Sequence, residues 1–370
     1  ATKFKIASAS AVGYPLKPKK RGSRSTTCPW PVRGAPWQEL SQAALSFRYR
    51  SPGGGMAANL HTVALTINNR CNLACPHCYL QYRGSDDAML ARVVEVVAES
   101  SFRHLAIVGK EPLVDESSVT TCLSLARSNV FANRTTSIIT NGITLQRVPE
   151  ELISLLAWID VSLDGGPASY SSYRGHHGAS LDRILVGVRR ARALGLRSAR
   201  ALHVLNSRTL PFIDDMILAS SDDVFDAVVF SPYIATLNDG TNSVNPVHPV
   251  EVLDALAQSP MFMRHPSAVL LVDCIHLRQA GFSYDSLVSE LELRNLTNRV
   301  RVFDRDPLEY GFLRLTYDGL VLAPEDSLHP SQYLARAHYS ILNGKPMRCL
   351  EDFYRDLVNK SSRCMPTYAA

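Results

Sequence analysis

From about residue 60 onward, short apolar runs alternate with longer runs in which apolar positions recur every three or four residues. The short runs have the length typical of buried strands and lie near residues 62–67, 104–108, 135–140, 158–163, 198–204 and 226–231. The longer runs have the period of amphipathic helices and lie near residues 86–100, 116–129, 149–156, 180–194, 209–219 and 248–258. Successive strand–helix repeats imply right-handed crossovers and parallel strand pairing. The pattern therefore predicts an α/β fold built on six strand–helix units.

After about residue 260 this alternation loosens. Residues 312–316 and 320–323 form two further apolar runs, separated by Tyr317, Asp318 and Gly319. An Asp-Gly pair between two strand-like runs is typical of a β-hairpin turn. We therefore expect residues 261–370 to form a C-terminal extension that contains this hairpin.

Composition is ordinary for a globular protein of 370 residues, with 46% hydrophobic and 20% charged residues. This length suffices for one large α/β domain with smaller attachments. No run approaches the ~20 apolar residues of a membrane-spanning helix, so we expect no membrane association. The N-terminal region lacks the long apolar core of a secretory signal, which favours a reducing cytoplasm.

Basic residues are concentrated at the N-terminus. Residues 1–55 hold ten Lys and Arg and one acid, Glu39, whereas the rest of the chain holds 29 basic and 33 acidic residues. The segment ends in the linker-like run 51–55. It is interpreted as a flexible segment, as a vector-derived or misassigned extension, or as a recognition arm for an acidic partner. Basic tails can bind nucleic acid, but no supporting fold accompanies this one, so nucleic acid is not an expected partner.

Three closely spaced cysteines carry the clearest chemistry. Cys71, Cys75 and Cys78 form a CxxxCxxC pattern that directly follows the strand predicted at 62–67. Thiolates are soft ligands and are the usual holders of iron–sulfur clusters. Three thiolates on one loop can bind three irons of a [4Fe–4S] cluster and leave the fourth iron open to a small molecule. The spacing therefore predicts a cluster loop at the carboxyl end of a strand, where ligand sites of parallel α/β folds gather.

Two other interpretations of these cysteines are weaker. A zinc site requires a fourth ligand, and His77, inside the loop, does not have the spacing of a paired motif. Disulfides do not suit three adjacent thiols in a chain without a secretory signal. The iron–sulfur interpretation is therefore preferred.

The loop and the motifs that follow it resemble the radical S-adenosylmethionine (SAM) superfamily. The run 109–112, Gly-Lys-Glu-Pro, is similar to the GGEP motif of that family, and Thr-Asn-Gly follows at 140–142. Residues 159–165 and Tyr-Arg-Gly at 173–175 complete the succession. The resemblance covers residues 60–235 well and points to the SPASM/twitch branch, which modifies peptides and natural products. It implies a partial (β/α)6 barrel over residues 56–260, followed by a small twitch-like α+β extension that covers the substrate.

The C-terminal extension departs from that branch. In relatives, the hairpin is followed by a cysteine that begins an auxiliary cluster, but here Pro324 and Glu325 stand in that place. Cys349 and Cys364 are 15 residues apart with no third cysteine nearby. We therefore expect a degenerate extension and one cluster, held by three cysteines; a second, noncanonical cluster is the alternative.

The resemblance also implies which residues contact SAM. Glu111 would meet the amino group of SAM, Tyr79 its adenine, and Ser162 with Asp164 its ribose or carboxylate. Arg174 would pair with the carboxylate of SAM or with substrate. Each of these residues also has a structural alternative. Arg174 could be an exposed structural arginine and Asp164 a turn residue, whereas Tyr79 could pack in the core and Glu111 could be a solvated loop acid. The full set of predicted SAM contacts is Tyr79, Gly109, Lys110, Glu111, Pro112, Asn141, Ser162, Asp164, Arg174 and Asn206. His203 and Tyr233 are further candidates.

Cys274 is the predicted catalytic residue outside the cluster loop. Some radical SAM epimerases use one thiol to donate hydrogen to the substrate radical, and Cys274 follows an apolar run. The alternative is a buried filler. Cys122 is expected in the core, and His176 with His177 in a loop, because adjacent residues point apart.

The resemblance implies an enzyme that cleaves SAM reductively to a 5′-deoxyadenosyl radical and abstracts hydrogen from a natural-product precursor. A ribosomal peptide is the favoured substrate and epimerisation the favoured outcome. The alternatives are epimerisation or dehydrogenation of an aminoglycoside-type sugar and, from another class, a non-catalytic iron–sulfur redox sensor. A flavodoxin or ferredoxin would supply the electron.

Overall fold

The computed structural model describes residues 59–78, 87–174, 180–220, 223–234, 244–303, 311–319, 321–322, 349–352 and 354–355. The chain divides into two compact units, Ala1–Arg48 and Tyr49–Ala370, and all described residues belong to the second. The predicted arm, residues 1–55, lies outside the described residues.

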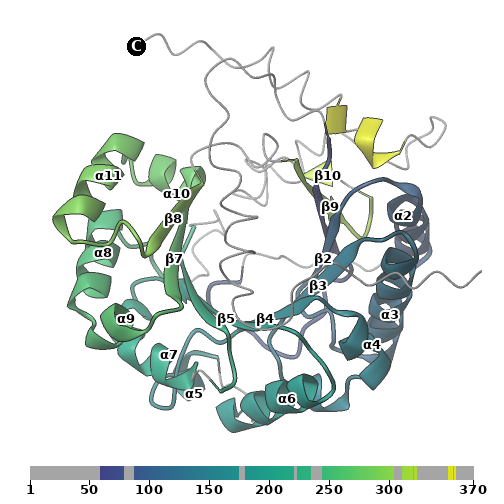
Figure 1. Cartoon of the computed structure of the whole chain (residues 1–370), viewed down its shortest axis with the longest axis horizontal. Coiled ribbons are helices and arrows are strands. Elements are labelled where there is room, and N and C mark those ends of the chain that lie inside the picture. Colours follow the sequence, from purple (N-terminus) through teal and green to yellow (C-terminus); the bar gives the residue numbers. More distant parts are fainter. Residues whose placement is uncertain are drawn as a thin grey trace, which may run out of the picture. The chain divides into compact units, whose positions relative to one another are not determined.

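A curved, mostly parallel sheet organises the second unit, with helices along its convex side (Figure 1). Its described strands are β1 (Thr62–Thr66), β2 (His104–Val108), β3 (Thr135–Thr140), β4 (Trp158–Ser162), β5 (Ala199–Leu205), β6 (Ala227–Pro232), β7 (Ala268–Asp273), β8 (Val300–Phe303), β9 (Phe312–Thr316) and β10 (Val321–Leu322). Their order is β10-β9-β1-β2-β3-β4-β5-β6-β7-β8, and every neighbouring pair except β10–β9 is parallel. The predicted α/β fold, an open radical SAM-like barrel, is confirmed.

Most crossovers between parallel strands contain a helix that packs on the sheet. The described helices are α2 (Asp87–Glu99), α3 (Glu116–Phe131), α4 (Glu150–Leu155), α5 (Tyr170–Tyr173), α6 (Leu181–Ala193), α7 (Ile213–Ala219), α8 (Pro249–Gln258), α9 (Pro260–Arg264), α10 (Cys274–Gln279) and α11 (Tyr284–Leu293), with 3-10 turns at Leu145–Arg147 and Leu210–Phe212. Polar caps begin several of them: Asp115 accepts from Ser118 N at 2.9 Å, and Ser180 accepts from Arg183 N at 3.2 Å. No helix among these is both long and apolar enough to cross a bilayer.

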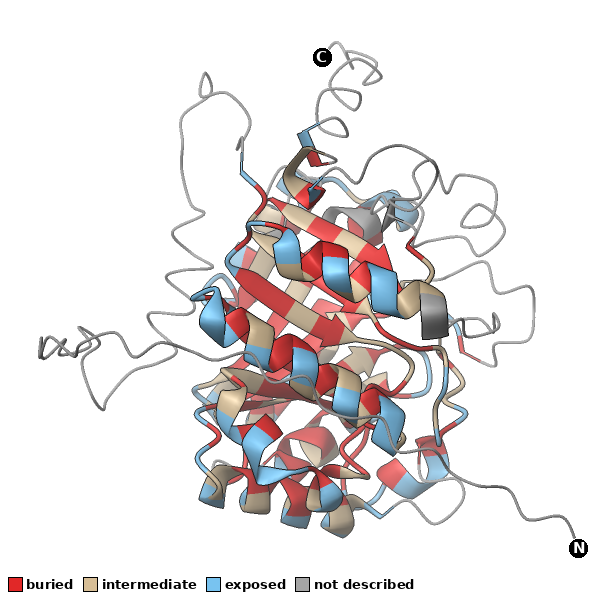
Figure 2. Ribbon diagram, turned by 90° about the vertical axis from the view of Figure 1, so that its right-hand side faces the viewer, coloured by how far each residue is buried: buried red, intermediate tan, exposed pale blue. Residues whose placement is uncertain are grey.

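Strand β5 alternates in burial because its two faces differ. Along β5, Ala199, Ala201, His203 and Leu205 are buried, whereas the residues between them are partly exposed. The buried positions join the core that the helices cover, and the others line the concave face. In Figure 2 the strands are largely buried, while the outer helices carry alternating buried and exposed bands.

Beyond residue 260 the fold is more regular than the sequence pattern indicates. Strands β7 and β8 extend the sheet from β6 in parallel, so the sheet has no break at residue 260. The predicted hairpin is confirmed, since β9 and β10 are antiparallel and Gly319 has a φ of 77°. Strand β9 also pairs in parallel with β1, which the local pattern did not indicate. The proposed boundaries at 55/56 and 260/261 stay a prediction.

Candidate active site

The cluster loop follows β1, at the edge of the sheet where parallel strands end. Cys71, Cys75 and Cys78 are free thiols of intermediate burial. The loop is shaped by its own hydrogen bonds, because Cys71 Sγ accepts from Leu73 N at 3.3 Å and Cys78 N donates to Cys75 O at 3.1 Å. The loops that follow β2, β3, β4 and β5 begin at the same edge of the sheet, because these strands are parallel to β1.

The Gly-Lys-Glu-Pro run after β2 packs tightly against the start of the cluster loop. A Cβ at Gly109 would lie 2.9 Å from Asn68 Oδ1 and 3.3 Å from Asn68 O, so glycine permits this close approach. Lys110 N and Glu111 N donate to Asn68 O and Arg70 O at 3.3 and 2.9 Å, and Asn68 Nδ2 donates to Glu111 O at 3.0 Å. The two loops therefore form one hydrogen-bonded unit.

Glu111 connects this unit to the end of β3. Its carboxylate is fully buried and accepts from Leu113 N at 3.0 Å, Thr140 Oγ1 at 2.7 Å and Asn141 N at 2.6 Å. Burial raises the pKa of Glu111, although these three hydrogen bonds oppose the rise. Complete burial excludes the solvated loop acid. Contact with the amino group of SAM stays a prediction.

Asn141 joins β3 to the cluster loop. Its Nδ2 donates to Asn72 Oδ1 at 2.7 Å and lies 3.8 Å from Cys71 Sγ, while its Oδ1 accepts from Ile143 N at 3.1 Å. This predicted site residue therefore lies beside the first cluster cysteine.

A buried ion pair closes the site at the end of β4. Arg174 Nε donates to Asp164 Oδ2 at 2.6 Å, and His77 Nε2 lies 3.1 Å from the same oxygen. Burial by itself would raise the pKa of Asp164, but the charges of Arg174 and His77 outweigh it and hold this pKa well below its usual range. Val204 N donates to the other carboxylate oxygen at 2.5 Å. Arg174 is buried, so it is not an exposed structural arginine.

His77 continues this network to β5. The amide of Asn206 donates to Tyr173 Oη at 2.6 Å, and Tyr173 Oη lies 2.8 Å from His77 Nδ1. Tyr173 Oη accepts from Asn206, and its own proton can be donated to His77 Nδ1. The rings of His77 and Tyr173 also stack, with centroids 5.3 Å apart. The cluster loop is thereby attached to the ends of two strands.

Asp215, on α7, holds the loop that leads from Asp164 to α5, the helix that Arg174 follows. Its carboxylate accepts from Gly166 N, Ala168 N and Ser169 N at 3.1, 3.0 and 3.0 Å, and from Ser169 Oγ at 2.6 Å. Four donors converge on one carboxylate, so the loop between β4 and α5 has a defined shape. Asp164 itself has a φ of 51°, a conformation that Asp tolerates better than most residues.

The remaining predicted residues are placed as follows. Ser162 ends β4 and is partly exposed on the concave face, and Pro112 O accepts from the thiol of Cys122 at 3.6 Å. Cys122 is fully buried, as expected. Cys274 begins α10 directly after β7, at the same edge of the sheet as the cluster loop. Tyr79, His176, His177 and Cys364 lie outside the described residues.

The two further candidates differ. His203 Nε2 lies 3.0 Å from Ser220 Oγ, at the end of α7, and its ring stacks on Phe230, so it belongs to the helix-covered core and not to the site. Tyr233 packs with Tyr173 in a small buried cluster, and its backbone N donates to Leu205 O at 2.7 Å. Tyr233 therefore lies beside the network.

Sequence reasoning gave no role in this network to three of its members. His77 was considered only as a zinc ligand and rejected as one, although its place between two cluster cysteines was a usable signal. Tyr173 directly precedes Arg174 in the sequence, and this position next to a predicted site residue was also a usable signal. Asp215 carried no signal, because a helical Asp in the first turn is common at any surface.

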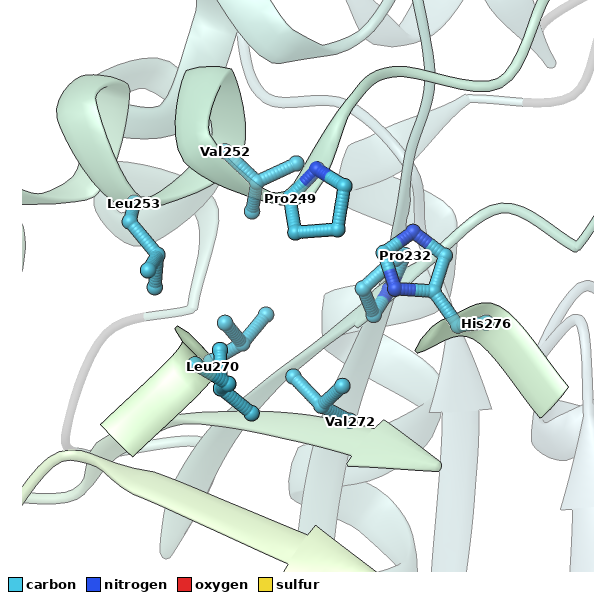
Figure 3. A pocket seen from close by; sticks show the side chains of 8 residues that line it. Pro232, Pro249, Val252, Leu253, Leu270, Val272 and His276 are labelled. Carbon is cyan, nitrogen blue, oxygen red and sulfur yellow. The ribbon is translucent and has the colours of Figure 1, made fainter. Parts of the chain in front are cut away.

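A separate small pocket lies among β6, β7, α8, α10 and α11 (Figure 3). It is lined mainly by apolar residues, with the ring of His276 beside that of Pro232. The space is too narrow for a water molecule. It is therefore packed interior and not a ligand site.

The donor set fits an iron–sulfur cluster better than a single ion. No three His, Cys, Asp or Glu side chains within the described residues converge on one ion. Three free thiols on one loop suit a four-iron cube that is held by three cysteines. Burial raises the pKa of Cys71 and Cys75, so both thiols would give up protons on binding metal. The buried hydroxyl of Tyr170 has no partner among the described residues, and a cluster sulfur would supply one.

Residues 65–213 match the model of the radical SAM superfamily, so this chain contains a radical SAM domain. The members of that class are enzymes that use SAM and a [4Fe–4S] cluster held by three cysteines. A GTP 3′,8-cyclase of Synechococcus sp. (strain CC9902) is 28% identical over 149 residues, which is 36% of this chain and 43% of the relative. The chain thus spans less than half the length of the curated relatives that it matches.

Solved structures show the same fold over a longer stretch. The structure of Streptococcus suis SuiB superposes on this chain with a TM-score of 0.58 at 13% sequence identity. The superposition covers 90% of this chain and 78% of SuiB. The structure of SuiB bound to precursor peptide SuiA superposes with a TM-score of 0.50 at 13% sequence identity. This superposition covers 94% of this chain and 76% of the SuiB chain.

Proposed function

We propose that this protein is a radical SAM enzyme that abstracts hydrogen from a peptide precursor. One observation carries the proposal: the loop with the three cysteines is hydrogen-bonded, through buried side chains, to the ends of β3, β4 and β5. A site that only stored electrons would not need buried polar residues from three strand ends bonded to its cysteine loop. The proposal therefore favours catalysis over a redox sensor.

Bound cluster and SAM would together supply a 5′-deoxyadenosyl radical. The residues of this chain would bind and orient SAM: Asn141 and Ser162 would contact it, and Arg174 would hold its carboxylate while Asp164 keeps the guanidinium in place. Glu111 and Gly109 would shape the loop that receives its amino group. Cys274 would donate the hydrogen that completes an epimerisation, and a flavodoxin or ferredoxin in the cytoplasm would supply the electron.

A peptide is favoured over a nucleotide for two reasons. The structural likeness to SuiB, which is seen bound to a peptide, covers nearly the whole chain, whereas the sequence likeness to the cyclases covers about a third of it. Binding of a nucleotide triphosphate also requires cationic side chains that are not already paired with carboxylates. Arg200, on the concave face of β5, is already paired with Asp160 and lies 5.2 Å from the Trp158 ring. An aminoglycoside-type sugar is the alternative substrate, and oxidative chemistry would follow if Cys349 helped to hold a second cluster.

The test is anaerobic reconstitution with iron and sulfide, followed by dithionite and SAM. We expect 5′-deoxyadenosine and methionine from the wild type and neither from a Cys71→Ala, Cys75→Ala, Cys78→Ala variant. Adding a synthetic peptide library should raise 5′-deoxyadenosine above the rate without substrate, and a matched set of aminoglycosides should not. A reducible cluster that never yields 5′-deoxyadenosine would favour the redox sensor instead.

A further inference from the structure

Two tyrosines on the short helix α5 differ in one respect. Both are buried, Tyr170 at 2% and Tyr173 at 4% exposure. The hydroxyl of Tyr173 contacts Asn206 and His77, whereas that of Tyr170 has no hydrogen-bond partner in the part of the chain that the structure describes. A buried polar group without a partner is destabilising and rare, so this one requires an explanation.

Tyr170 lies close enough to the cluster loop to interact electrostatically with Cys75. Arg174 N donates to Tyr170 O at 2.8 Å, so the tyrosine lies one helical turn before the arginine of the ion pair. Its side chain belongs to the core cluster that includes Leu73 of the cluster loop, and Cys75 packs against that same cluster. Burial raises the pKa of Tyr170 to about 12, and the charges that act on it are those of Arg174, Cys75 and Asp164. Its hydroxyl is therefore a protonated donor at neutral pH.

The polar groups nearby are already occupied. Arg174 and His77 both contact Asp164 Oδ2, and Val204 N contacts Oδ1. The thiol of Cys75 makes no hydrogen bond within the described part of the chain. The hydroxyl of Tyr170 thus lacks an acceptor in the same neighbourhood in which a cluster would bring thiolate and sulfide sulfurs, which accept hydrogen bonds.

We propose that Tyr170 donates a hydrogen bond to a sulfur of the bound cluster, either the Cys75 thiolate or an adjacent sulfide, and so raises its reduction potential. The inference rests on the cluster binding of the proposed function, but not on SAM cleavage or on the substrate. A donor to sulfur stabilises the reduced cluster, which is the more negative state, and hydrogen bonds to sulfur are one of the factors that set cluster potentials. Tyr170 would thereby ease the one-electron reduction on which SAM cleavage depends.

The test compares Tyr170→Phe with Tyr173→Phe, which removes the same atom one turn away. Without iron, Tyr170→Phe should melt at or above the temperature of the wild type, because it loses no bond, and Tyr173→Phe should melt lower. With the cluster reconstituted and SAM absent, Tyr170→Phe should show a more negative midpoint potential in a redox titration and shifted Fe–S stretching bands in the resonance Raman spectrum. Tyr173→Phe should change both less.

Two results would overturn the inference. One is a Tyr170→Phe protein with full iron content whose potential and Raman bands equal those of the wild type. The other is an iron-free Tyr170→Phe protein that is as destabilised as Tyr173→Phe, because the hydroxyl would then have a partner within the protein. A shifted potential in a protein that forms no 5′-deoxyadenosine would support this inference and contradict the proposed enzymatic function, so the two are separable.

Discussion

Asp164 and Arg174 form a buried ion pair, with Arg174 Nε 2.6 Å from Asp164 Oδ2, and His77 of the cluster loop contacts the same oxygen at 3.1 Å. Neither charged group reaches water to any extent, since their side chains are 1% and 8% exposed. Each charge is stable there only because the other is present. The pair thus couples the position of the β4 end to that of the cluster loop.

Removing one charge of this pair should strongly destabilise the fold. In Asp164→Asn, the guanidinium of Arg174 stays buried without its counter-charge, and we expect a loss of about 3–5 kcal/mol in the free energy of unfolding. Urea denaturation of the iron-free protein measures this. The control is Glu151→Gln, which removes a pair with Arg127 that is half exposed on both sides and should therefore change stability far less. Equal losses in the two variants would contradict the structural role of the buried pair.

The cysteines of the loop should differ from the buried core cysteine in iron binding. We expect the Cys71→Ala, Cys75→Ala, Cys78→Ala variant to retain almost no iron after anaerobic reconstitution, because thiolates are the ligands that hold the cluster. Cys122→Ala should keep the iron content of the wild type, since Cys122 is fully buried and contacts Pro112 O. Iron and sulfide analysis gives the answer, and a triple variant that still bound four irons would refute the cluster assignment.

Asp215 should support SAM binding without touching it. In Asp215→Asn, an amide NH2 replaces one of the oxygens that accept from the loop 166–169, which should cost about 1–3 kcal/mol of stability. This loop connects Asp164 to the helix that Arg174 follows, so we also expect weaker SAM binding by the reconstituted protein, measured by calorimetry.

Asp214→Asn is the matched control for Asp215. Asp214 accepts from Ser259 Oγ and Met261 N, at the start of α9, so its loss should lower stability while SAM affinity is retained. If both variants bound SAM as well as the wild type, Asp215 would have no supporting role in the site.

Two buried histidines should make the fold sensitive to mild acid. Burial lowers the pKa of His104 to about 3 and that of His203 to about 4. Both fall below the value of ~6.5 in the unfolded chain, so the unfolded state binds protons first as the pH drops. Their contribution to stability is therefore complete above pH ~6.5 and is lost as the pH falls from there toward 3–4.

The measurement is the free energy of unfolding between pH 7 and 4. Each histidine contributes at most about 1.4 kcal/mol per pH unit in this window. A His104→Gln, His203→Gln variant should have a flatter profile than the wild type. An unchanged slope would show that neither histidine is held neutral by the fold.

The strands β1 to β6 were predictable because each is a short apolar run bounded by polar residues, and their observed ends lie within about two residues of the expected ones. Strand β8 was not predictable, because it has only four residues and one of them is Arg301. The pairing of β9 with β1 joins residues about 250 positions apart, and no local pattern encodes such a pairing.

The chemistry of the site was visible in sequence wherever it depends on residue type and short spacing. Several site residues directly follow predicted strands: the three cysteines, the loop of Gly109 to Pro112, and Asn141. Parallel strands bring their carboxyl ends to one edge of the sheet. Which side chains then meet depends on strand order and register. His77 contacts Tyr173, 96 residues away, and Asp164 contacts Val204 across β4 and β5.

The sequence by itself thus determined the class of fold, the cluster loop and most of the residues at the carboxyl edge, because spacing within a few residues encodes these features. Only the tertiary structure decided that Arg174 is buried, that His77 belongs to the site, and that the hydroxyl of Tyr170 meets no partner within the described ranges. Burial and hydrogen bonding are properties of the assembled surroundings, and packing sets them only after distant strands have come together.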